Sequence, residues 1–280
     1  TALLGSPVAH SISPLMHNES FRLLGLDYVY LCFDVNEETL PAAVAGLKTC
    51  GIRGFNLTMP NKNKIVELLD DLSPEAQLIG AVNTVLNDNG KLIGYNTDGY
   101  GFMQSVRDAG HDITGKNITV MGVGGASMAI CAQSALDGAA SVHIFARRTS
   151  RYWNRTQKFA ENLSAKTGCQ VCLFDNDDHT ALRDSIAQSY LLINATSVGM
   201  VPDIDDTIIK DTSLFHPELV VADVVYEPQE TRLLREAKAA GCQTFNGMYM
   251  LLHQGAKAFQ IWTGQEMPVS VIKEKYFSVK

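Results

Sequence analysis

Residues 117–127 read Asn-Ile-Thr-Val-Met-Gly-Val-Gly-Gly-Ala-Ser, a β-branched apolar run that passes through three glycines into an apolar, helix-favouring segment. This order of strand, tight glycine turn and helix is typical of the first βαβ unit of a dinucleotide-binding fold. Gly122 permits the turn, Gly124 lets the backbone approach a pyrophosphate, and the amides that begin the helix can bind that anion. Ser127, beside Ala126, takes the third small position of the fingerprint. The alternative is a structural glycine turn without a ligand.

The alternation of strand and helix continues beyond this turn. The pattern predicts six strands separated by helices, at 118–121, 141–145, 170–174, 191–195, 219–225 and 243–245. Six such strands fit a doubly wound parallel sheet. An apolar helix over 248–262 and a last helix over 269–276 have no strand left to accompany, so we expect them to return to the first domain.

The first 98 residues form a separate α/β pattern. Strands are predicted at 2–4, 28–35, 52–59 and 81–86, helices at 14–24, 40–48 and 64–72, and a tight hairpin turn at 87–90. We therefore expect a substrate-binding catalytic domain over 1–99, completed by 247–280. A Rossmann-type dinucleotide-binding domain is expected over 100–246.

The bulk composition is that of an ordinary globular protein, with 280 residues of which 46% are hydrophobic and 19% charged. A net charge of −7 argues against binding to nucleic acid or to anionic lipid and favours a small-molecule partner. No apolar run approaches the roughly 20 residues that span a bilayer, and the first ten residues lack the pattern of a signal peptide. We expect a cytoplasmic protein, and the sequence leaves a homodimer open.

The six cysteines lie mostly in apolar runs, as reduced, buried thiols do. Cys169 and Cys172 form a C-x-x-C pair, but a zinc site would need a second pair or nearby histidines. A redox site would need the pair at the start of a helix, whereas this pair lies in a strand-like run. The sequence predicts no metal.

A polar cluster ends the predicted strand over 52–59. Asn56 and Thr58 point to the same side of an extended strand, and Pro60 ends it before Lys62. The alternative for Lys62 is a solvated lysine, although a cation is mildly disfavoured at a helix start.

Other polar residues also lie next to predicted strand ends. Asp98 could be an ordinary helix N-cap, Asn83 a turn or core amide, and Ser13 a helix cap beside Ser11. Gln254 could be a polar residue in a buried helix. Together, however, hydroxyls, amides, one lysine and one carboxylate gather where open α/β sheets bind ligands, which suits a small polyhydroxy acid.

The chain resembles the shikimate dehydrogenase family, and within it the quinate/shikimate dehydrogenase branch most closely. The resemblance runs from the first residue to the last helix, over the motifs at 5–18, 56–62, 80–84, 95–99, 122–127, 194–200, 223–228 and 247–255. It implies an NAD(P)-dependent oxidoreductase that interconverts shikimate and 3-dehydroshikimate in aromatic amino-acid biosynthesis, the chorismate pathway.

The resemblance also implies roles for individual residues. Lys62 and Asp98 would form the catalytic pair. Substrate would be bound by Ser11, Ser13 and Tyr226 at its carboxylate, and by Asn56, Thr58, Asn83, Asp98 and Gln254 at its ring hydroxyls. The dinucleotide would be bound by Gly122, Gly124, Gly125, Ala126, Ser127, Arg147, Arg148, Thr196, Val224, Gly247, Met250 and Leu251.

The chemistry of the pair agrees with this, because an alcohol that loses hydride must also lose its hydroxyl proton. A lysine oriented by a carboxylate can move that proton. For the cofactor, the segment 146–151 has no acidic residue and three arginines, which favours NADP over NAD. The alternative for these arginines is a solvated loop.

Two further functions stay open at this stage. A quinate or dual quinate/shikimate dehydrogenase would differ by a small change in the pocket, which the sequence does not resolve. A non-catalytic nucleotide-sensing protein of the same fold would be expected to lack Lys62 or Asp98, and both are present.

Overall fold

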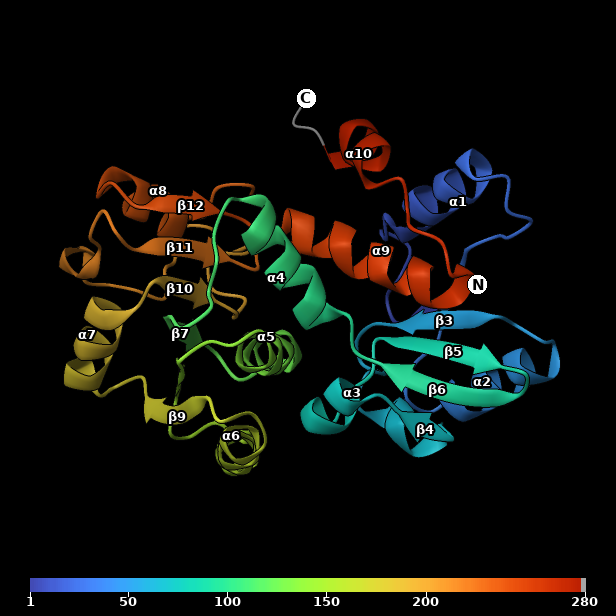
Figure 1. Ribbon diagram of the computed structural model, residues 1–280, viewed down its shortest axis with the longest axis horizontal. Helices are drawn as coiled ribbons and strands as arrows, with labels where there is room; N and C mark the ends of the chain where they lie inside the picture. Colours follow the sequence, from blue (N-terminus) through green and yellow to red (C-terminus); the bar gives the residue numbers. More distant parts are fainter. Residues whose placement is uncertain (278–280) are drawn as a thin grey trace. The chain divides into compact units, whose positions relative to one another are not determined.

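The computed structural model describes residues 1–277, and the chain divides into two compact units. Unit 1 comprises Thr1–Gly101 and the C-terminal segment from Leu251, and unit 2 comprises Phe102–Met250. The divisions fall within helix α4 (Asp98–Asp108) and helix α9 (Met248–Thr263), both labelled in Figure 1. The expected return of the C-terminal helices to the N-terminal unit is confirmed.

Unit 1 contains a six-stranded mixed sheet in the order β2-β1-β3-β5-β6-β4. β1, β2 and β3 are parallel, β5 is antiparallel to both β3 and β6, and β4 is parallel to β6. The strands are β1 (Ala2–Gly5), β2 (Leu31–Asp34), β3 (Gly54–Leu57), β4 (Asp71–Leu72), β5 (Thr84–Asp88) and β6 (Lys91–Tyr95). The remaining elements are α1 (Ser13–Leu23), α2 (Leu40–Thr49), the 3-10 helix η1 (Lys64–Leu68), α3 (Pro74–Ile79), α10 (Val269–Ile272) and the π-helical turn η3 (Lys273–Phe277).

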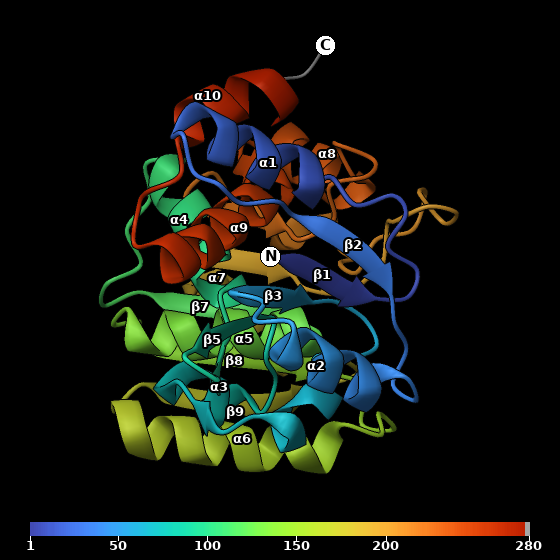
Figure 2. The same ribbon diagram turned by 90° about the vertical axis from the view of Figure 1, so that its right-hand side faces the viewer.

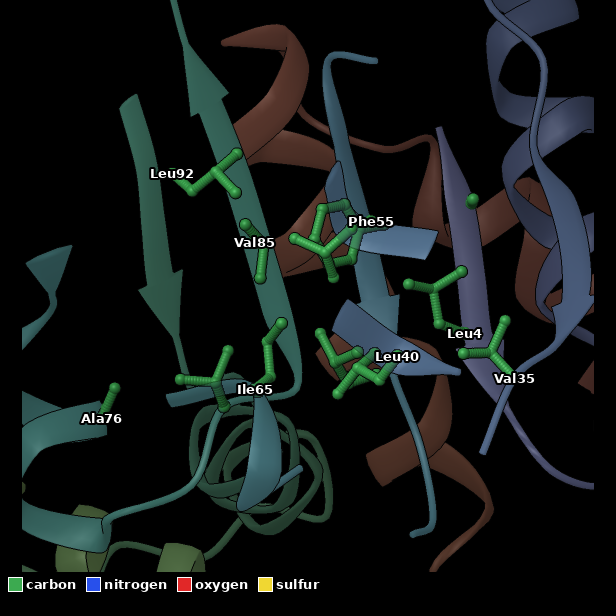
Figure 3. Close-up of a cluster of buried hydrophobic side chains, with 12 residues drawn as sticks. Leu4, Val35, Leu40, Phe55, Ile65, Ala76, Val85 and Leu92 are labelled. Atoms are coloured by element: carbon green, nitrogen blue, oxygen red, sulfur yellow. The ribbon is translucent and has the colours of Figure 1, made fainter. Parts of the chain in front are cut away.

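The two faces of this sheet bury different side chains because alternate residues of a strand point to opposite sides. Leu4 and Phe55 face α2 and the η1 turn, where they pack with Leu40, Ile65 and Val85 (Figure 3). α1, α9 and α10 cover the other face (Figure 2). The polar side chains of the site project from this second face and from the strand ends.

Part of unit 1 differs from the sequence prediction. The segment 64–72, predicted as one helix, forms the η1 turn and the short strand β4. The apolar spacing fits a helix, but the Asp70 amide donates to the Leu92 carbonyl (2.9 Å) and the Leu92 amide to the Asp70 carboxylate (2.7 Å). Pairing with β6 therefore overrides the local pattern.

The predicted strand over 28–35 is regular only at β2. Before β2, the Asn18 side chain binds both backbone groups of Tyr30, which takes the place of strand pairing there.

Unit 2 is a six-stranded sheet in which every pairing is parallel, in the order β12-β11-β10-β7-β8-β9. This is the strand order of a Rossmann fold, with its switch point between β7 and β10. The predicted doubly wound sheet is confirmed. Its strands are β7 (Asn117–Met121), β8 (Ser141–Ala146), β9 (Gln170–Asp175), β10 (Leu191–Asn194), β11 (Val220–Asp223) and β12 (Gln243–Phe245). Its other helices are α5 (Gly125–Leu136), α6 (Trp153–Thr167), α7 (His179–Gln188), the 3-10 turn η2 (Thr212–Leu214) and α8 (Arg232–Ala239).

Helices cover both faces of this parallel sheet, as Figure 1 shows, with α5 and α6 on one side and α7 and α8 on the other. The α7 and α8 side buries an apolar cluster that includes Leu192, Val221 and Leu234.

All six cysteines are free thiols, with Cys169 buried next to β9 and Cys172 half-buried within it. Among residues 1–277, no helix combines the length and the apolarity that crossing a bilayer requires.

Candidate active site

Lys62 and Asp98 meet at one edge of the unit 1 sheet. Lys62 lies in the turn after β3, where its carbonyl accepts a hydrogen bond from the Val82 amide (2.8 Å). Asp98 begins α4 directly after β6. The Lys62 Nζ atom lies 2.6 Å from Asp98 Oδ2, and the lysine side chain keeps 27% of its surface exposed while the aspartate keeps 9%. The ammonium can therefore be reached from outside while its carboxylate partner is shielded.

Asn83 orients the carboxylate of this pair. Its Nδ2 group donates to Asp98 Oδ1 (2.8 Å) and to Thr97 Oγ1 (2.9 Å), and its Oδ1 accepts from the Thr97 amide (2.8 Å). Rotating the amide by half a turn would place its oxygen against a carboxylate, so these contacts fix its orientation. Asn83 is almost fully buried. Asp98 is thus held by Asn83 through one oxygen and bound to Lys62 through the other.

Two residues that build this corner, Thr97 and Asn96, were not predicted as site residues from the sequence. Thr97 bonds Asn83 through its amide and its hydroxyl. Asn96 accepts the Asp98 amide (3.1 Å) with its side-chain oxygen and donates to the Ala81 carbonyl (3.0 Å). An Asx turn at Asn96 was the available signal, because asparagine often binds the amide two residues ahead. The alternative of Asp98 as an ordinary N-cap is excluded, since α4 begins at Asp98 itself.

Asn56 lies beside this corner, on β3. Its Nδ2 group donates to the Asn83 carbonyl (3.0 Å) and to Thr84 Oγ1 (2.9 Å), and its Oδ1 accepts from the Tyr30 hydroxyl (2.8 Å). Both amide hydrogens are therefore used within the protein. What Asn56 can still offer a ligand is the second lone pair of its carbonyl oxygen.

Two other predicted substrate ligands, Gln254 and Thr58, lie in the same unit. Gln254, on α9, is half-buried and places its Oε1 atom 3.3 Å from the Nδ2 atom of Asn83. Thr58 follows β3 and lies so close to Gly5 that a Cβ atom there would be 2.2 Å from the Thr58 methyl group. Glycine at position 5 therefore leaves the space that Thr58 occupies beside β1.

Ser11 and Ser13 lie at the start of α1. The Ser11 hydroxyl accepts the Ser13 amide (3.2 Å), and the helix begins at Ser13 without a side-chain cap. The alternative of Ser13 as a helix cap is therefore excluded. The Ser13 hydroxyl lowers the pKa of the buried Tyr30 phenol, against the larger, raising effect of burial.

The glycine turn of unit 2 has the shape of an anion-binding loop. Gly122 has φ +109°, and a Cβ atom there would lie 2.8 Å from the Thr196 methyl group and 3.0 Å from the Ala195 carbonyl. Gly124 and Gly125 have open space around their Cα atoms. The Ser127 hydroxyl donates to the Gly122 carbonyl (2.6 Å) and closes the turn. The first amides of α5 have no partner within the helix and face this turn.

The arginines after β8 are exposed, and within the described chain neither Arg147 nor Arg148 forms an ion pair. Arg148 lies over the Trp153 ring at 4.6 Å, and its amide donates to Asp175 at 3.3 Å. The guanidinium groups are therefore available to an anion at the end of the second strand of the unit, where dinucleotide folds read the ribose.

The loops after β10 and β11 are fixed by the buried carboxylate of Asp223. It accepts hydrogen bonds from the Asn194 side chain (3.0 Å), the Val225 amide (2.9 Å) and the Thr231 hydroxyl (2.8 Å). Burial raises the pKa of Asp223 to about 6, and these three hydrogen bonds oppose that rise. Thr196 is held in turn by the Asn194 side chain (2.6 Å).

The remaining predicted ligands lie around these loops and the start of α9. Gly247 packs against the Val224 backbone so tightly that a Cβ atom would lie 2.1 Å from the Val224 carbonyl oxygen. Tyr226 is exposed in the loop after β11, and Met250 and Leu251 lie half-buried in α9. Tyr226 and Met250 belong to unit 2 and Leu251 to unit 1. Their roles stay predictions. No grouping of three or more His, Cys, Asp or Glu suited to a metal ion occurs within residues 1–277.

Two family models match the chain. Residues 3–85 match the shikimate dehydrogenase substrate binding domain, and residues 247–275 match the shikimate 5'-dehydrogenase C-terminal domain. The chain is 52% identical over 275 residues to a shikimate dehydrogenase (NADP(+)) of Listeria innocua, covering 98% of this chain and 94% of that protein.

Solved structures agree with these matches. The shikimate 5-dehydrogenase of Listeria monocytogenes, in complex with shikimate and NAD, superposes with a TM-score of 0.95 at 51% identity, covering 98% of this chain and 94% of that one. The quinate dehydrogenase of Corynebacterium glutamicum, in complex with NAD, has a TM-score of 0.87 at 31% identity, covering 99% and 98%.

The expected closeness to the quinate/shikimate branch is not supported, because the chain is more similar to these shikimate dehydrogenases than to this quinate dehydrogenase. The wider resemblance is confirmed by the identity and by the length over which it extends. The chain belongs to the shikimate dehydrogenase family of oxidoreductases.

Proposed function

We propose that this protein is an NADP-dependent shikimate dehydrogenase that interconverts shikimate and 3-dehydroshikimate. The observation that carries the proposal is the contact between Lys62 Nζ and Asp98 Oδ2 (2.6 Å) among buried amides and hydroxyls. Such a lining suits a ligand with several hydroxyl groups, and the lysine supplies the proton transfer that hydride chemistry requires.

The chain's own residues would carry the proton. A bound nicotinamide dinucleotide would exchange the hydride with the substrate carbon. In the direction of oxidation, Lys62 as an uncharged amine would accept the hydroxyl proton. In the direction of reduction, the Lys62 ammonium polarises the ketone and returns the proton to the developing alkoxide. Asp98 stabilises the ammonium, and Asn83 keeps the carboxylate oxygen turned toward it.

The other predicted ligands would orient the ring. Ser11 and Ser13, with Tyr226, are proposed to hold the carboxylate. Asn56, Thr58, Asn83 and Gln254 are proposed to bind the ring hydroxyls. Because the amide hydrogens of Asn56 are already used, we expect Asn56 to accept a hydrogen bond from a hydroxyl rather than to donate one.

The dinucleotide would lie on unit 2. The open space at Gly124 and Gly125 and the first amides of α5 fit a pyrophosphate. Exposed Arg147 and Arg148, with no acidic residue in segment 146–151, fit the additional phosphate of NADP. Thr196, Val224, Gly247, Met250 and Leu251 are proposed to contact the nicotinamide half. NAD is the alternative cofactor.

A matrix of two substrates and two cofactors tests the proposal. Shikimate and quinate would each be supplied with NADP and with NAD, and nicotinamide absorbance would give kcat/KM for each pair. The proposal expects the highest kcat/KM for shikimate with NADP. No turnover of shikimate with either cofactor would overturn it, and a preference for quinate would show a different substrate for the same site.

We further propose a cytoplasmic location and leave the homodimer as a prediction. Cell fractionation tests the first, and sedimentation of the purified protein distinguishes a monomer from a dimer.

A further inference from the structure

Tyr30 lies directly behind Asn56, one of the proposed substrate ligands. Its hydroxyl donates to Asn56 Oδ1 at 2.8 Å. Tyr30 precedes β2 and Asn56 lies on β3, so this hydrogen bond joins two segments that are 26 positions apart in sequence. Tyr30 has no part in the proposed proton transfer.

The position of Tyr30 is fixed independently of Asn56. Its amide donates to Asn18 Oδ1 (2.7 Å), and its carbonyl accepts from Asn18 Nδ2 (3.0 Å). Its ring stacks on His17 with the centroids 4.4 Å apart and the planes 6° apart, and it packs against Trp262 at 6.1 Å. With 1% of its surface exposed, the side chain is enclosed by its neighbours. Its hydroxyl is therefore a fixed reference point for the side chain that binds it.

The hydroxyl also selects one orientation of the Asn56 amide. Asn56 Oδ1 accepts from Tyr30, while Nδ2 donates to the Asn83 carbonyl and to Thr84. The reversed amide would place its oxygen against the Asn83 carbonyl, where two acceptors would repel each other. In the observed orientation the free lone pair of Asn56 is an acceptor for a substrate hydroxyl. Burial raises the pKa of Tyr30, so the phenol stays a donor at neutral pH.

We propose that Tyr30 is a positioning residue for substrate binding, whose hydroxyl holds Asn56 in the geometry that receives the substrate. The inference rests on the proposed function, because it takes Asn56 as a substrate ligand. Tyr30 itself touches neither the substrate nor the Lys62–Asp98 pair, so its loss affects binding of the substrate and leaves the proton transfer intact.

Tyr30→Phe removes the hydroxyl and keeps the stacked ring. Loss of one buried hydrogen bond of this kind corresponds to about a tenfold change in an equilibrium constant. We expect KM for shikimate to rise about tenfold, while kcat and KM for NADP stay within about twofold of wild type. Tyr28→Phe is the matched control, because Tyr28 lies two residues away, is exposed, and is not bonded to a proposed ligand. It should match wild type in all three constants.

The Asn56→Ala background separates positioning from general loss of structure. If Tyr30 acts largely through Asn56, Tyr30→Phe should raise KM for shikimate by less than about threefold in that background. A similar rise in KM for shikimate in both backgrounds would overturn the inference. So would Tyr30→Phe constants equal to those of Tyr28→Phe, or a Tyr30→Phe effect confined to kcat. If wild type and Tyr28→Phe fail to turn over shikimate, the proposed function fails and this inference fails with it.

Discussion

Lys62 and Asp98 are 36 positions apart in sequence, and the structure brings them into contact. The gathering of polar residues next to strand ends predicted that they lie in one region, and the family resemblance implied that they form a pair. The amides and hydroxyls that hold them were harder to foresee. Thr97 and Tyr30 make contacts that depend on the packing of distant strands, so no local pattern marked them, whereas Asn96 carried the signal of an Asx turn. The alternative of Ser13 as a helix cap is excluded because α1 begins at Ser13 itself, without a side-chain cap.

His17 makes the stability of the protein depend on pH. Its side chain is fully buried, and neither ring nitrogen has a hydrogen-bond partner. Burial lowers the pKa of His17 to about 3, and the positive charge of the N-terminus contributes a smaller lowering effect. Below pH 6.5 the unfolded chain binds a proton that the native His17 does not. As the pH decreases from 6.5 to 3, the free energy of unfolding should therefore decrease by about 1.4 kcal/mol per pH unit because of this residue.

Urea unfolding of wild type and His17→Phe at pH 7 and pH 5 measures this dependence. The variant should lose less stability than wild type over that interval. Phe21→Leu is the control, because it weakens the same aromatic cluster but keeps the histidine, so it should retain the wild-type slope. Equal slopes for wild type and His17→Phe would show that His17 titrates alike in the folded and unfolded chain.

Arg148 is expected to decide the cofactor. A charge-assisted hydrogen bond to the additional phosphate contributes about 1.5–3 kcal/mol, so Arg148→Gln should lower kcat/KM for NADP about 10- to 100-fold. The value for NAD should change little, because NAD lacks that phosphate. Arg183→Gln removes another exposed arginine of unit 2, on α7, and should change neither value. An equal loss with both cofactors would mean that Arg148 does not read the phosphate.

At the scale of elements, the second unit was more predictable than the first. Its strands are apolar runs between glycine turns and helices, and all six lie where the pattern placed them, within a few residues. In the first unit, the segment 64–72 carries helical spacing but pairs with β6 through Asp70 and Leu92. That pairing joins residues more than twenty positions apart, so a local window does not contain the information.

Gly247 tests how tightly the end of β12 packs against the loop after β11. A Cβ atom there would meet the Val224 backbone at 2.1 Å, and backbone cannot move aside as a flexible side chain can. Gly247→Ala should lower the free energy of unfolding by about 1–3 kcal/mol. Gly46→Ala, in α2 with open space around it, should raise stability by about 0.5–1 kcal/mol. Urea titration measures both. Equal stability of the two variants would mean that the loop relaxes without cost.

At the scale of the whole molecule, the chain builds one unit, crosses into a second and returns to the first through α9. This return brings Gln254 to Asn83, 171 positions earlier in the sequence. The sequence predicted the return because the last helices had no strand to accompany. It could not predict which face of α9 turns toward Asn83, because that depends on close contacts such as Gly255 against Met16.

Lys62 and Asp98 are proposed to act as one proton-transfer unit, and the activity of the whole molecule depends on it. The most direct test is a double-mutant cycle on kcat for shikimate oxidation with Lys62→Ala, Asp98→Asn and the double variant. Each single variant should lower kcat by about 10²- to 10⁴-fold, and the double variant should be no slower than the worse single one by more than about threefold. Lys64→Ala, two residues from Lys62, should keep wild-type kcat. Near-native turnover by Lys62→Ala, or losses that multiply in the double variant, would contradict the account.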